Sequence, residues 1–300
     1  MNATRANDCP SCPICDGNET TLHFYSPETA LSQSSIGSSR QQVSAGRILR
    51  CRNCGFGFSQ IRSSAGELAS LYRSMDTKVY KSELSGRERT ARRHLTILER
   101  YAQRGRLLDV GCASGLFLFA AVQRGWKAAG VEPSEVLCTA ARKRLAGQAE
   151  VHCATLEQAR LAGEFDAVTL WDVLEHVPHP RAFLSECKAL MRPGGHLFLN
   201  VPDLGSLQAR VLGARWPLLL PEHLNYFTRS SLRLCGERAG LKLVCFGRRR
   251  VSFSLSYIAF RVSQHNMPGS AVLRRLAGGF LGRILVPVSM GETFAVWQRV

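Results

Sequence analysis

A glycine-rich turn between an acidic strand end and an apolar helix is the feature that most constrains this chain. Residues 107–115 read LLDVGCASG, and an apolar segment begins at Leu116. Glycines let the chain reverse tightly and let a ligand approach the backbone, while a helix N-terminus offers unbonded N–H groups. Glu132 lies 21 residues past Gly111, where the second strand of such a fold presents a carboxylate to a ribose diol. The pattern predicts a site for a nucleoside cofactor.

Strand-like and helical segments alternate from residue 105 onward. The expected strands are 106–110, 127–131, 149–152, 165–170, 196–200, 241–246 and 292–298, and the expected helices are 115–124, 134–146, 179–191 and 229–239. This alternation predicts a doubly wound α/β fold with a parallel sheet. Ligands of such sheets bind at the carboxyl ends of the strands, and both Asp109 and Glu132 are expected there.

Two Cys-x-x-Cys turns near the N-terminus predict a metal centre. They consist of Cys12 with Cys15 and Cys51 with Cys54. Four thiolates can bind one tetrahedral Zn²⁺, and a closed four-cysteine site is structural. Residues 1–60 are therefore predicted to form a zinc-ribbon-like unit, with a hairpin and a flexible tip between the two turns. Cys9 could replace one of the four, and an iron–sulfur site or unligated cysteines are the alternatives.

The amino-acid composition indicates which binding partners and which cell compartment to expect for this protein. The net charge of +16 favours an anionic partner such as nucleic acid, a phosphorylated sugar or an acidic membrane surface, although a solvated basic surface explains it equally well. The polar N-terminus has no signal-peptide pattern, and no apolar run reaches the length of a membrane span. Several of the 11 cysteines are expected in the core as free thiols, which fits a reducing cytoplasm. These are Cys138, Cys187, Cys235 and Cys245.

Two further segments are predicted to be helical. Residues 61–104 form a helical linker, with apolar residues at helical spacing in both halves. These are Leu68, Leu71, Tyr72, Leu95, Leu98 and Tyr101. Residues 248–290 form an insert between the last two strands, in which Leu273, Leu276, Phe280 and Ile284 repeat at helical spacing. A basic amphipathic helix over 271–286 could lie on an anionic membrane, although such a stripe packs more often against its own core.

Four motifs together point to one family. They are DVGCASG at 109–115, Glu132, DVLEH at 172–176 and RPGG at 192–195. In order and spacing they resemble the class I S-adenosylmethionine-dependent methyltransferases over about residues 85–247, and GETFAVW at 291–297 resembles the last strand of that fold. The cysteine unit together with PEHLNYFT at 221–228 resembles a bacterial subfamily whose members often act in sugar or polysaccharide pathways.

The resemblance implies a Rossmann-like, doubly wound, seven-stranded sheet over 105–300 and S-adenosylmethionine as the methyl donor. Asp109 and the 111–115 turn would border the methionine end, and Glu132 would hold the ribose hydroxyls. The implied cofactor-binding residues are Asp109, Gly111, Cys112, Ala113, Gly115, Glu132, Pro133, Trp171 and Asp172. Ala113 departs from the family, which usually has glycine there. The family often has an acidic residue after the third strand, beside the adenine; this region reads CATLE at 153–157, which leaves the adenine contact open.

Methyl transfer from a sulfonium depends mainly on alignment and desolvation, and a hydroxyl or enolisable carbon acceptor also needs a general base. The candidate catalytic residues are His176, His223 and the adjacent Glu222, although each histidine could instead be structural. Residues 172–176 also resemble the Glu-x-x-Glu-His run of quinone-pathway O-methyltransferases, which suggests a divalent metal on Asp172, Glu175 and His176. Asp172 is shorter than the glutamate of that run.

The predicted function is methyl transfer to a small-molecule or glycan acceptor, namely a sugar, a sugar nucleotide or a lipid-linked glycan intermediate. The expected location is the cytoplasm, with peripheral contact at the inner membrane surface as an option. One alternative is an RNA methyltransferase that uses the zinc unit and the basic surface. Against it, the zinc region has few aromatic residues beyond Phe56 and Phe58. The other alternative is a non-catalytic binding module with the same cofactor fold.

Overall fold

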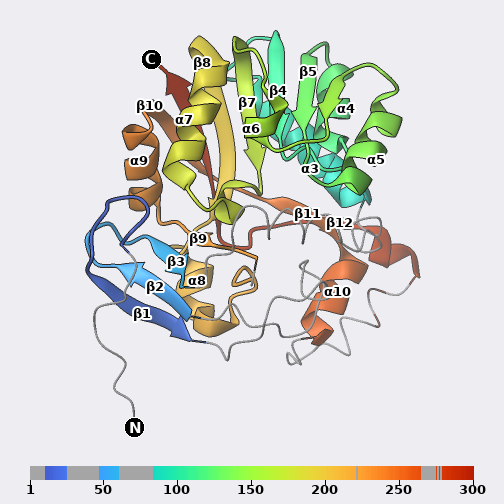
Figure 1. The fold of residues 1–300 in the computed structure, drawn as a ribbon. Coiled ribbons are helices and arrows are strands. Elements are labelled where there is room, and N and C mark those ends of the chain that lie inside the picture. Colours follow the sequence, from blue (N-terminus) through green and yellow to red (C-terminus); the bar gives the residue numbers. More distant parts are fainter. Residues whose placement is uncertain are drawn as a thin grey trace.

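A seven-stranded sheet forms the centre of the computed structural model, which describes residues 11–25, 47–60, 84–220, 222–264, 275, 277 and 279–300. The strand order is β10-β13-β8-β7-β4-β5-β6 (Figure 1). The strands are β4 (Arg106–Val110), β5 (Lys127–Val131), β6 (Glu150–His152), β7 (Phe165–Trp171), β8 (Met191–Pro202), β10 (Leu241–Arg248) and β13 (Glu292–Arg299). All seven predicted strands are present, which confirms the α/β Rossmann-like fold.

The sheet is mixed, whereas the sequence predicted a parallel one. Strands β4 to β8 pair in parallel, but β13 runs antiparallel between β8 and β10. The insert after β10 explains this difference. Among the insert residues that the structure describes, no helix leads from β10 into a parallel β13, and β13 begins at Glu292 beside Pro202 of β8. The chain therefore re-enters the sheet in the reverse direction.

Helices cover both faces of the sheet (Figure 1). They are α3 (Leu84–Leu98), α4 (Leu116–Val122), α5 (Glu135–Leu145), α6 (Leu156–Ala159), α7 (Pro180–Leu190) and α9 (Arg229–Arg238). Side chains of β4 alternate between two cores, since Leu107 packs with α3, α4 and α5 and Leu108 packs with α7 and α9. Local signals begin the predicted helices: the Ser134 side chain caps α5, and Thr228 with Ser231 forms a capping box at α9.

The cysteine turns carry a small antiparallel sheet that continues into the distant 221–228 segment. Its order is β1 (Thr20–Tyr25), β2 (Arg47–Cys51), β3 (Gly57–Ser59) and β9 (Asn225–Tyr226). The β1–β2 pairing confirms the predicted hairpin, while Cys9 and the predicted tip lie outside the described residues. Phe56 and Phe58 are buried in the same core as α7 and α9. The cysteine unit is thus packed against the main sheet.

The linker and the insert are only partly described. In the linker, Leu95 and Leu98 of α3 are buried as core residues, whereas Leu68, Leu71 and Tyr72 lie outside the described residues. The insert contains β11 (Val251–Ser254), α10 (Leu255–Gln264), the 3-10 helix η4 (Gly279–Arg283) and β12 (Leu285–Val288), while Leu273 and Leu276 are not described. The prediction of a helix that extends over 271–286, through Ile284, was wrong. Strand β12 pairs with β11 immediately after Ile284, and Gly279 has a left-handed φ of 65°.

One cysteine differs from its prediction. Cys138 of α5 was expected to be free, but it forms a disulfide with Cys153, at a Cα–Cα distance of 5.7 Å. Cys187 and Cys235 are free and buried, and Cys245 is free and half-buried. Within the described part of the chain, no helix is both long and apolar enough to cross a membrane.

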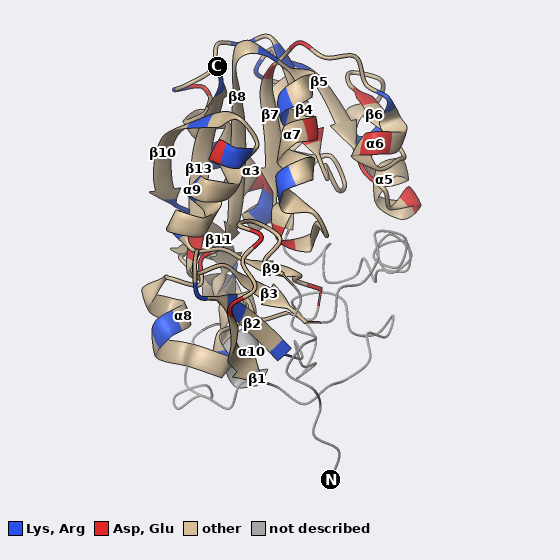
Figure 2. Ribbon diagram, turned by 60° about the vertical axis from the view of Figure 1, so that its left-hand side comes forward, with Lys and Arg blue, Asp and Glu red and all other residues tan. Residues whose placement is uncertain are grey.

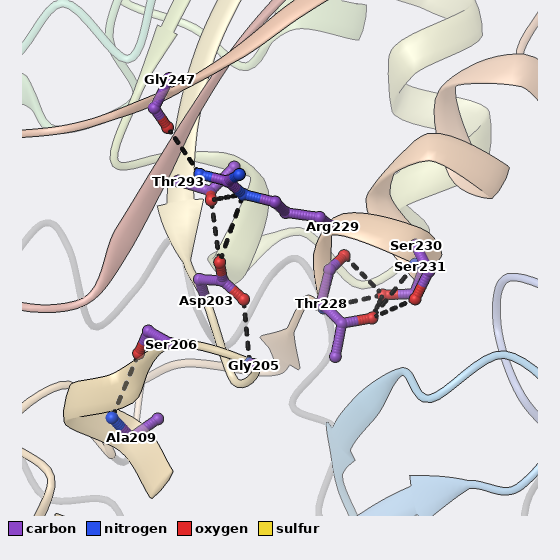
Figure 3. Close-up of polar contacts among 10 residues, drawn as sticks. All are labelled: Asp203, Gly205, Ser206, Ala209, Thr228, Arg229, Ser230, Ser231, Gly247 and Thr293. Carbon is purple, nitrogen blue, oxygen red and sulfur yellow. Dashed lines mark hydrogen bonds and ion pairs between the residues drawn. The ribbon is translucent and has the colours of Figure 1, made fainter. Parts of the chain in front are cut away.

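A polar network ties the carboxyl edge of the sheet to the start of α9 (Figure 3). The Thr293 hydroxyl of β13 donates to Asp203 Oδ2 over 2.9 Å, and Arg229 Nε donates to the Thr293 hydroxyl over 3.1 Å. The Gly205 N–H donates to the other Asp203 oxygen. The helix α8 (Leu207–Leu212) and the 3-10 helix η3 (Gly213–Arg215) follow directly, so this network fixes where the chain leaves β8.

We predict that Gly236→Ala destabilises the protein by about 1–3 kcal/mol, because overpacking a tight core costs that much. A β-carbon at this position of α9 would lie 2.4 Å from the ring of the buried Trp297. Equilibrium denaturant unfolding measures the change. Glu237→Ala, at the neighbouring exposed position of the same helix, is the control and should change stability little. Equal stability of both variants would contradict this packing.

Candidate active site

The glycine turn at 111–115 is held against the end of β5. The N–H groups of Gly111 and Cys112 both donate to the Val131 carbonyl, over 2.8 and 3.1 Å. Gly111 and Gly115 have left-handed φ values of 76° and 74°. A β-carbon on Gly115 would lie 3.1 Å from Ala141 Cβ in α5, so a larger residue would push that helix away. The turn and the start of α4 therefore form a tight backbone bend at the carboxyl edge.

Ala113 also adopts a left-handed conformation, with a φ of 48°. For a residue with a side chain this costs about 1 kcal/mol or more, which explains why the resembling family usually has glycine here. The Ala113 N–H donates to Glu132 Oε2 over 2.9 Å. The Ala113 backbone is thus bonded to the acidic residue that directly follows β5.

Glu132 connects this turn to the start of α5. Its second oxygen accepts from the Ser134 N–H over 2.8 Å, beyond the half-buried Pro133. The carboxyl group is buried, and burial raises its pKa. Each carboxylate oxygen can accept more than one hydrogen bond, so these contacts leave capacity for a ribose diol.

Asp109 and Trp171 lie on the neighbouring strands β4 and β7 at the same edge. Asp109 is buried, accepts a 2.6 Å hydrogen bond from the Thr169 hydroxyl, and has its pKa raised to about 7 by burial. Trp171 ends β7, and its ring stacks on His94 of α3, with 4.1 Å between ring centroids. Phe294 stacks with Trp171 at 6.0 Å. Trp171 thus belongs to an aromatic cluster beside the predicted cofactor site.

Asp172 is bound by an arginine that the sequence analysis did not single out. Arg249 donates to both Asp172 oxygens over 2.5 and 2.7 Å and also to Glu292. Asn200 of β8 donates to Asp172 over 2.7 Å. Asp172 has a left-handed φ of 58°, a conformation that usually costs energy and is concentrated at functional sites. Arg249 lay within a three-arginine run and Glu292 within the GETFAVW motif, but neither pattern signals this pairing.

The predicted catalytic histidines come together. His176 lies in the 3-10 helix η2 (Leu174–His176), and its ring is 4.8 Å from that of His223, centroid to centroid. Burial lowers the pKa of both histidines, to about 3 for His223, so both are neutral at pH 7. Glu175, His176 and His223 form a group whose ligand atoms all lie within 4.8 Å of one another. Asp172 is not part of this group, although the resemblance implied that it would be.

Backbone carbonyls orient both imidazoles. His176 Nδ1 lies 2.9 Å from the carbonyl oxygen of Glu222, and His223 Nδ1 lies 2.9 Å from that of Leu218. A carbonyl only accepts, so Nδ1 carries the proton in each ring and Nε2 has the lone pair. Glu222 thus positions His176 through its main chain, while its own carboxyl group is buried.

The histidine group lies next to the cofactor turn. A β-carbon on Gly111 would be 2.7 Å from Val173 Cγ2, in the segment that leads into η2. Asn225 secures that segment, since its amide donates to the carbonyls of Leu174 and Val177 over 2.9 and 2.7 Å. The sequence motif contained Asn225, but its partners lie about 50 residues away and could not be inferred from it.

The four predicted cysteine ligands also converge. Cys12 Sγ lies 3.6 Å from Cys54 Sγ, and Cys15 Sγ lies 3.4 Å from Cys51 Sγ. All four sulfurs lie within 4.8 Å of one another. Sulfurs on a tetrahedral zinc with bonds of about 2.3 Å would be about 3.8 Å apart, so the donor set and its spacing fit such an ion.

Comparison with known proteins identifies the family. A family model described as a methyltransferase domain matches residues 82–245, more than half of the chain. The chain belongs to this methyltransferase family. The fold and the family confirm an S-adenosylmethionine-dependent methyltransferase domain, as the motifs predicted.

Named relatives of this methyltransferase are similar over almost half of its length. The ubiquinone biosynthesis O-methyltransferase of Aromatoleum aromaticum is 35% identical over 149 residues, which span 46% of this chain and 64% of that protein. The protein of the same name from Coxiella burnetii is 32% identical over 149 residues, with the same two coverages. The chain thus spans less than two thirds of these relatives. The structure of a putative sarcosine dimethylglycine methyltransferase from Galdieria sulphuraria shares the fold, with a TM-score of 0.50, 14% identity and coverage of 70% of this chain and 85% of that one.

We predict that Asp109→Asn stabilises the folded methyltransferase at neutral pH while weakening cofactor binding. The folded-state pKa of about 7 lies above the ordinary 3.8. The wild-type protein therefore loses stability as pH rises from about 4 to 7, at no more than about 1.4 kcal/mol per pKa unit.

The variant lacks this penalty, so its advantage should be largest above pH 7 and vanish below pH 4. Denaturant unfolding across this range measures the stability, and calorimetry measures S-adenosylmethionine binding. A stability difference that does not vary with pH would contradict ionisation of a buried Asp109.

Proposed function

We propose that this methyltransferase transfers the methyl group of S-adenosylmethionine to a hydroxyl oxygen of a small molecule. The observation that carries the proposal is the group of Glu175, His176 and His223 beside the glycine turn. A hydroxyl is a weak nucleophile until its proton is removed. A neutral imidazole with a lone pair on Nε2 can take that proton, and both histidines are held in this form.

The chemistry assigns each part of the site a role. The acceptor oxygen bonds to the methyl carbon while the carbon–sulfur bond breaks, and its electron pair goes to sulfur. Because the positive charge on sulfur disappears, the protein contributes alignment and exclusion of water rather than a new charge. The glycine turn and Glu132 fix the donor, and His176, which is less buried than His223, receives the hydroxyl proton.

We favour a phenolic hydroxyl as the acceptor. The relatives named ubiquinone biosynthesis O-methyltransferase support this choice, because they resemble almost half of this chain at 32–35% identity. A sugar, sugar nucleotide or glycan acceptor stays a prediction that no comparison supports. RNA binding favours basic residues that are clustered on one surface. Figure 2 shows Lys and Arg positions on elements as far apart as α7 and α8, with acidic positions between them. Methylation of RNA and contact with a membrane also remain predictions.

The proposal is tested with methyl-labelled S-adenosylmethionine and a panel of a catechol, a sugar nucleotide, a glycan and RNA. We expect label in the catechol. His176→Asn should lower kcat by about 100-fold or more, since a general base contributes that much, and should leave cofactor binding unchanged. His179→Asn, an exposed histidine three residues away, is the matched control and should keep full activity. Label in RNA alone would overturn the proposal.

We also propose that Cys12, Cys15, Cys51 and Cys54 bind one structural Zn²⁺. Support comes from the spacing of the four sulfurs and from the buried β2 and β3 strands around them. Elemental analysis of the purified protein should give about one zinc per chain, the stoichiometry of a closed four-thiolate site. Cys51→Ser should lose the zinc and lower the melting temperature. Cys245→Ser, which keeps a hydrogen-bonding group near Tyr101, should retain the metal. The zinc site would be refuted if the purified wild-type protein contained no zinc and its melting temperature did not rise when zinc was added.

A further inference from the structure

We propose that the Cys138–Cys153 disulfide is a thiol-exchange site, where a thiol or dithiol reductant opens the bridge and thereby weakens S-adenosylmethionine binding. Cys138 lies in α5, and Cys153 directly follows β6, 15 residues further along the chain. The two elements lie side by side at one end of the sheet (Figure 2). The bridge belongs to the donor half of the enzyme, so its effect does not depend on which acceptor is methylated.

The two cysteines of the bridge differ in exposure. Cys138 is fully buried, whereas Cys153 is exposed. A disulfide is opened by a thiolate that attacks one of its sulfurs, and access decides which sulfur that is. Attack is therefore expected at Cys153 Sγ, with the Cys138 sulfur as the leaving group.

The predicted compartment favours a bridge that opens and closes. The other cysteines that the structure describes are not disulfide-bonded, and the cysteine usage of the chain predicts a reducing cytoplasm. Disulfides are rare there, and those that form are usually transient, catalytic or redox-sensing. A bridge with one exposed cysteine is accessible to such exchange, which favours a redox-sensing role over a permanent structural one.

The reductant balances the exchange. Its thiolate bonds to Cys153 Sγ while the S–S bond breaks, and the electron pair of that bond goes to Cys138 Sγ, which takes up a proton. A second thiol of the reductant then attacks the reductant sulfur of the mixed disulfide and releases Cys153 as a thiol. In total the bridge gains two electrons and two protons, and the reductant becomes a disulfide. Oxidised glutathione reverses these steps.

The bridge closes a ring of contacts that contains the predicted ribose-binding residue Glu132. The Glu132 N–H donates to the carbonyl of His152, the residue before Cys153, over 3.0 Å. On the other side, Glu132 Oε1 accepts from the Ser134 N–H over 2.8 Å. The Ser134 carbonyl in turn accepts from the Cys138 N–H over 2.8 Å. The S–S bond thus joins the two ends of a chain of contacts that holds Glu132.

The helix that carries Cys138 also contacts the glycine turn. Arg144 Nε of α5 donates to the Ser114 carbonyl over 2.9 Å, and Ala141 packs against Gly115. Because α5 touches both the turn and the Glu132 contacts, its anchoring to β6 affects both parts of the predicted cofactor site. A site that is preorganised loses less conformational entropy when its ligand binds. Opening the bridge should therefore lower the affinity for S-adenosylmethionine.

A second connection between α5 and β6 should keep the opened form folded. Arg142 donates from Nε and Nη2 to the Val151 carbonyl, over 3.1 and 2.8 Å. Strand β6 also stays paired with β5. None of these contacts involves sulfur. The expected result of reduction is a reversible change in cofactor affinity rather than unfolding.

Calorimetric titration of S-adenosylmethionine into the full-length protein measures the effect. The protein is treated with oxidised glutathione or with dithiothreitol, and mass spectrometry of alkylated peptides reports the state of the bridge. Reduction should raise the Kd about 3-fold or more, the scale expected for lost preorganisation, and reoxidation should restore it. Cys153→Ser, which opens the bridge without a reductant and so leaves the cysteine turns untouched, should have the weaker affinity throughout. Cys245→Ser, on β10, should respond as the wild type does.

A matched pair of variants tests the site of attack. Oxidised glutathione should modify the remaining Cys153 of Cys138→Ala, and it should modify the remaining Cys138 of Cys153→Ser far more slowly, because a buried thiol is unreactive. Four results would each overturn the proposal: no bridge after oxidation, a bridge that dithiothreitol leaves closed, faster modification of Cys138 than of Cys153, or equal cofactor affinity of the oxidised and reduced wild type. Equal affinity with lower stability after reduction would make the bridge merely structural.

Discussion

The hydrogen bonds that hold residues 222–228 against η2 support everything else at this site. The Leu224 N–H donates to the Glu175 carbonyl over 2.8 Å, and the Asn225 amide bonds the carbonyls on both sides of η2. These contacts are buried, so each lost partner would leave an unsatisfied polar group that costs about 1–3 kcal/mol. His176 and His223 face each other only because these two segments, distant in the sequence, are joined in this register.

The cysteine unit extends that support. Strand β9 adds to the edge of β3, and the Ser59 N–H donates to the Leu224 carbonyl over 3.0 Å. Phe56 packs against Phe227 at 5.0 Å between ring centroids. A two-residue strand has little stability of its own, so the segment that carries His223 depends on the sheet that the cysteine turns organise. The predicted zinc site and the predicted acceptor site are thus mechanically connected, although the sequence suggests two separate units.

Local pattern predicted the elements well and their long-range partners poorly. The seven strands and the four predicted helices follow from hydrophobic period and capping residues such as Ser134, which act within a few residues. The glycine turn and Glu132 were predictable because their spacing reflects one β-α-β unit. Arg249, Asn200 and Asn225 were not, because each meets a partner at least 28 residues away. The direction of β13 was also hidden, since it depends on the path of the insert rather than on the strand itself.

Several features that cost folding free energy lie at the carboxyl edge of the sheet. Ala113 and Asp172 adopt left-handed backbone conformations, and Asp109 and Glu175 are carboxyl groups whose pKa is raised by burial. None of these features helps the chain to fold, and proteins retain such features mainly where function requires them. A bound ligand with a positive charge would compensate a buried carboxylate such as Asp109. The position of these features therefore supports the proposed location of the donor and acceptor sites at this edge.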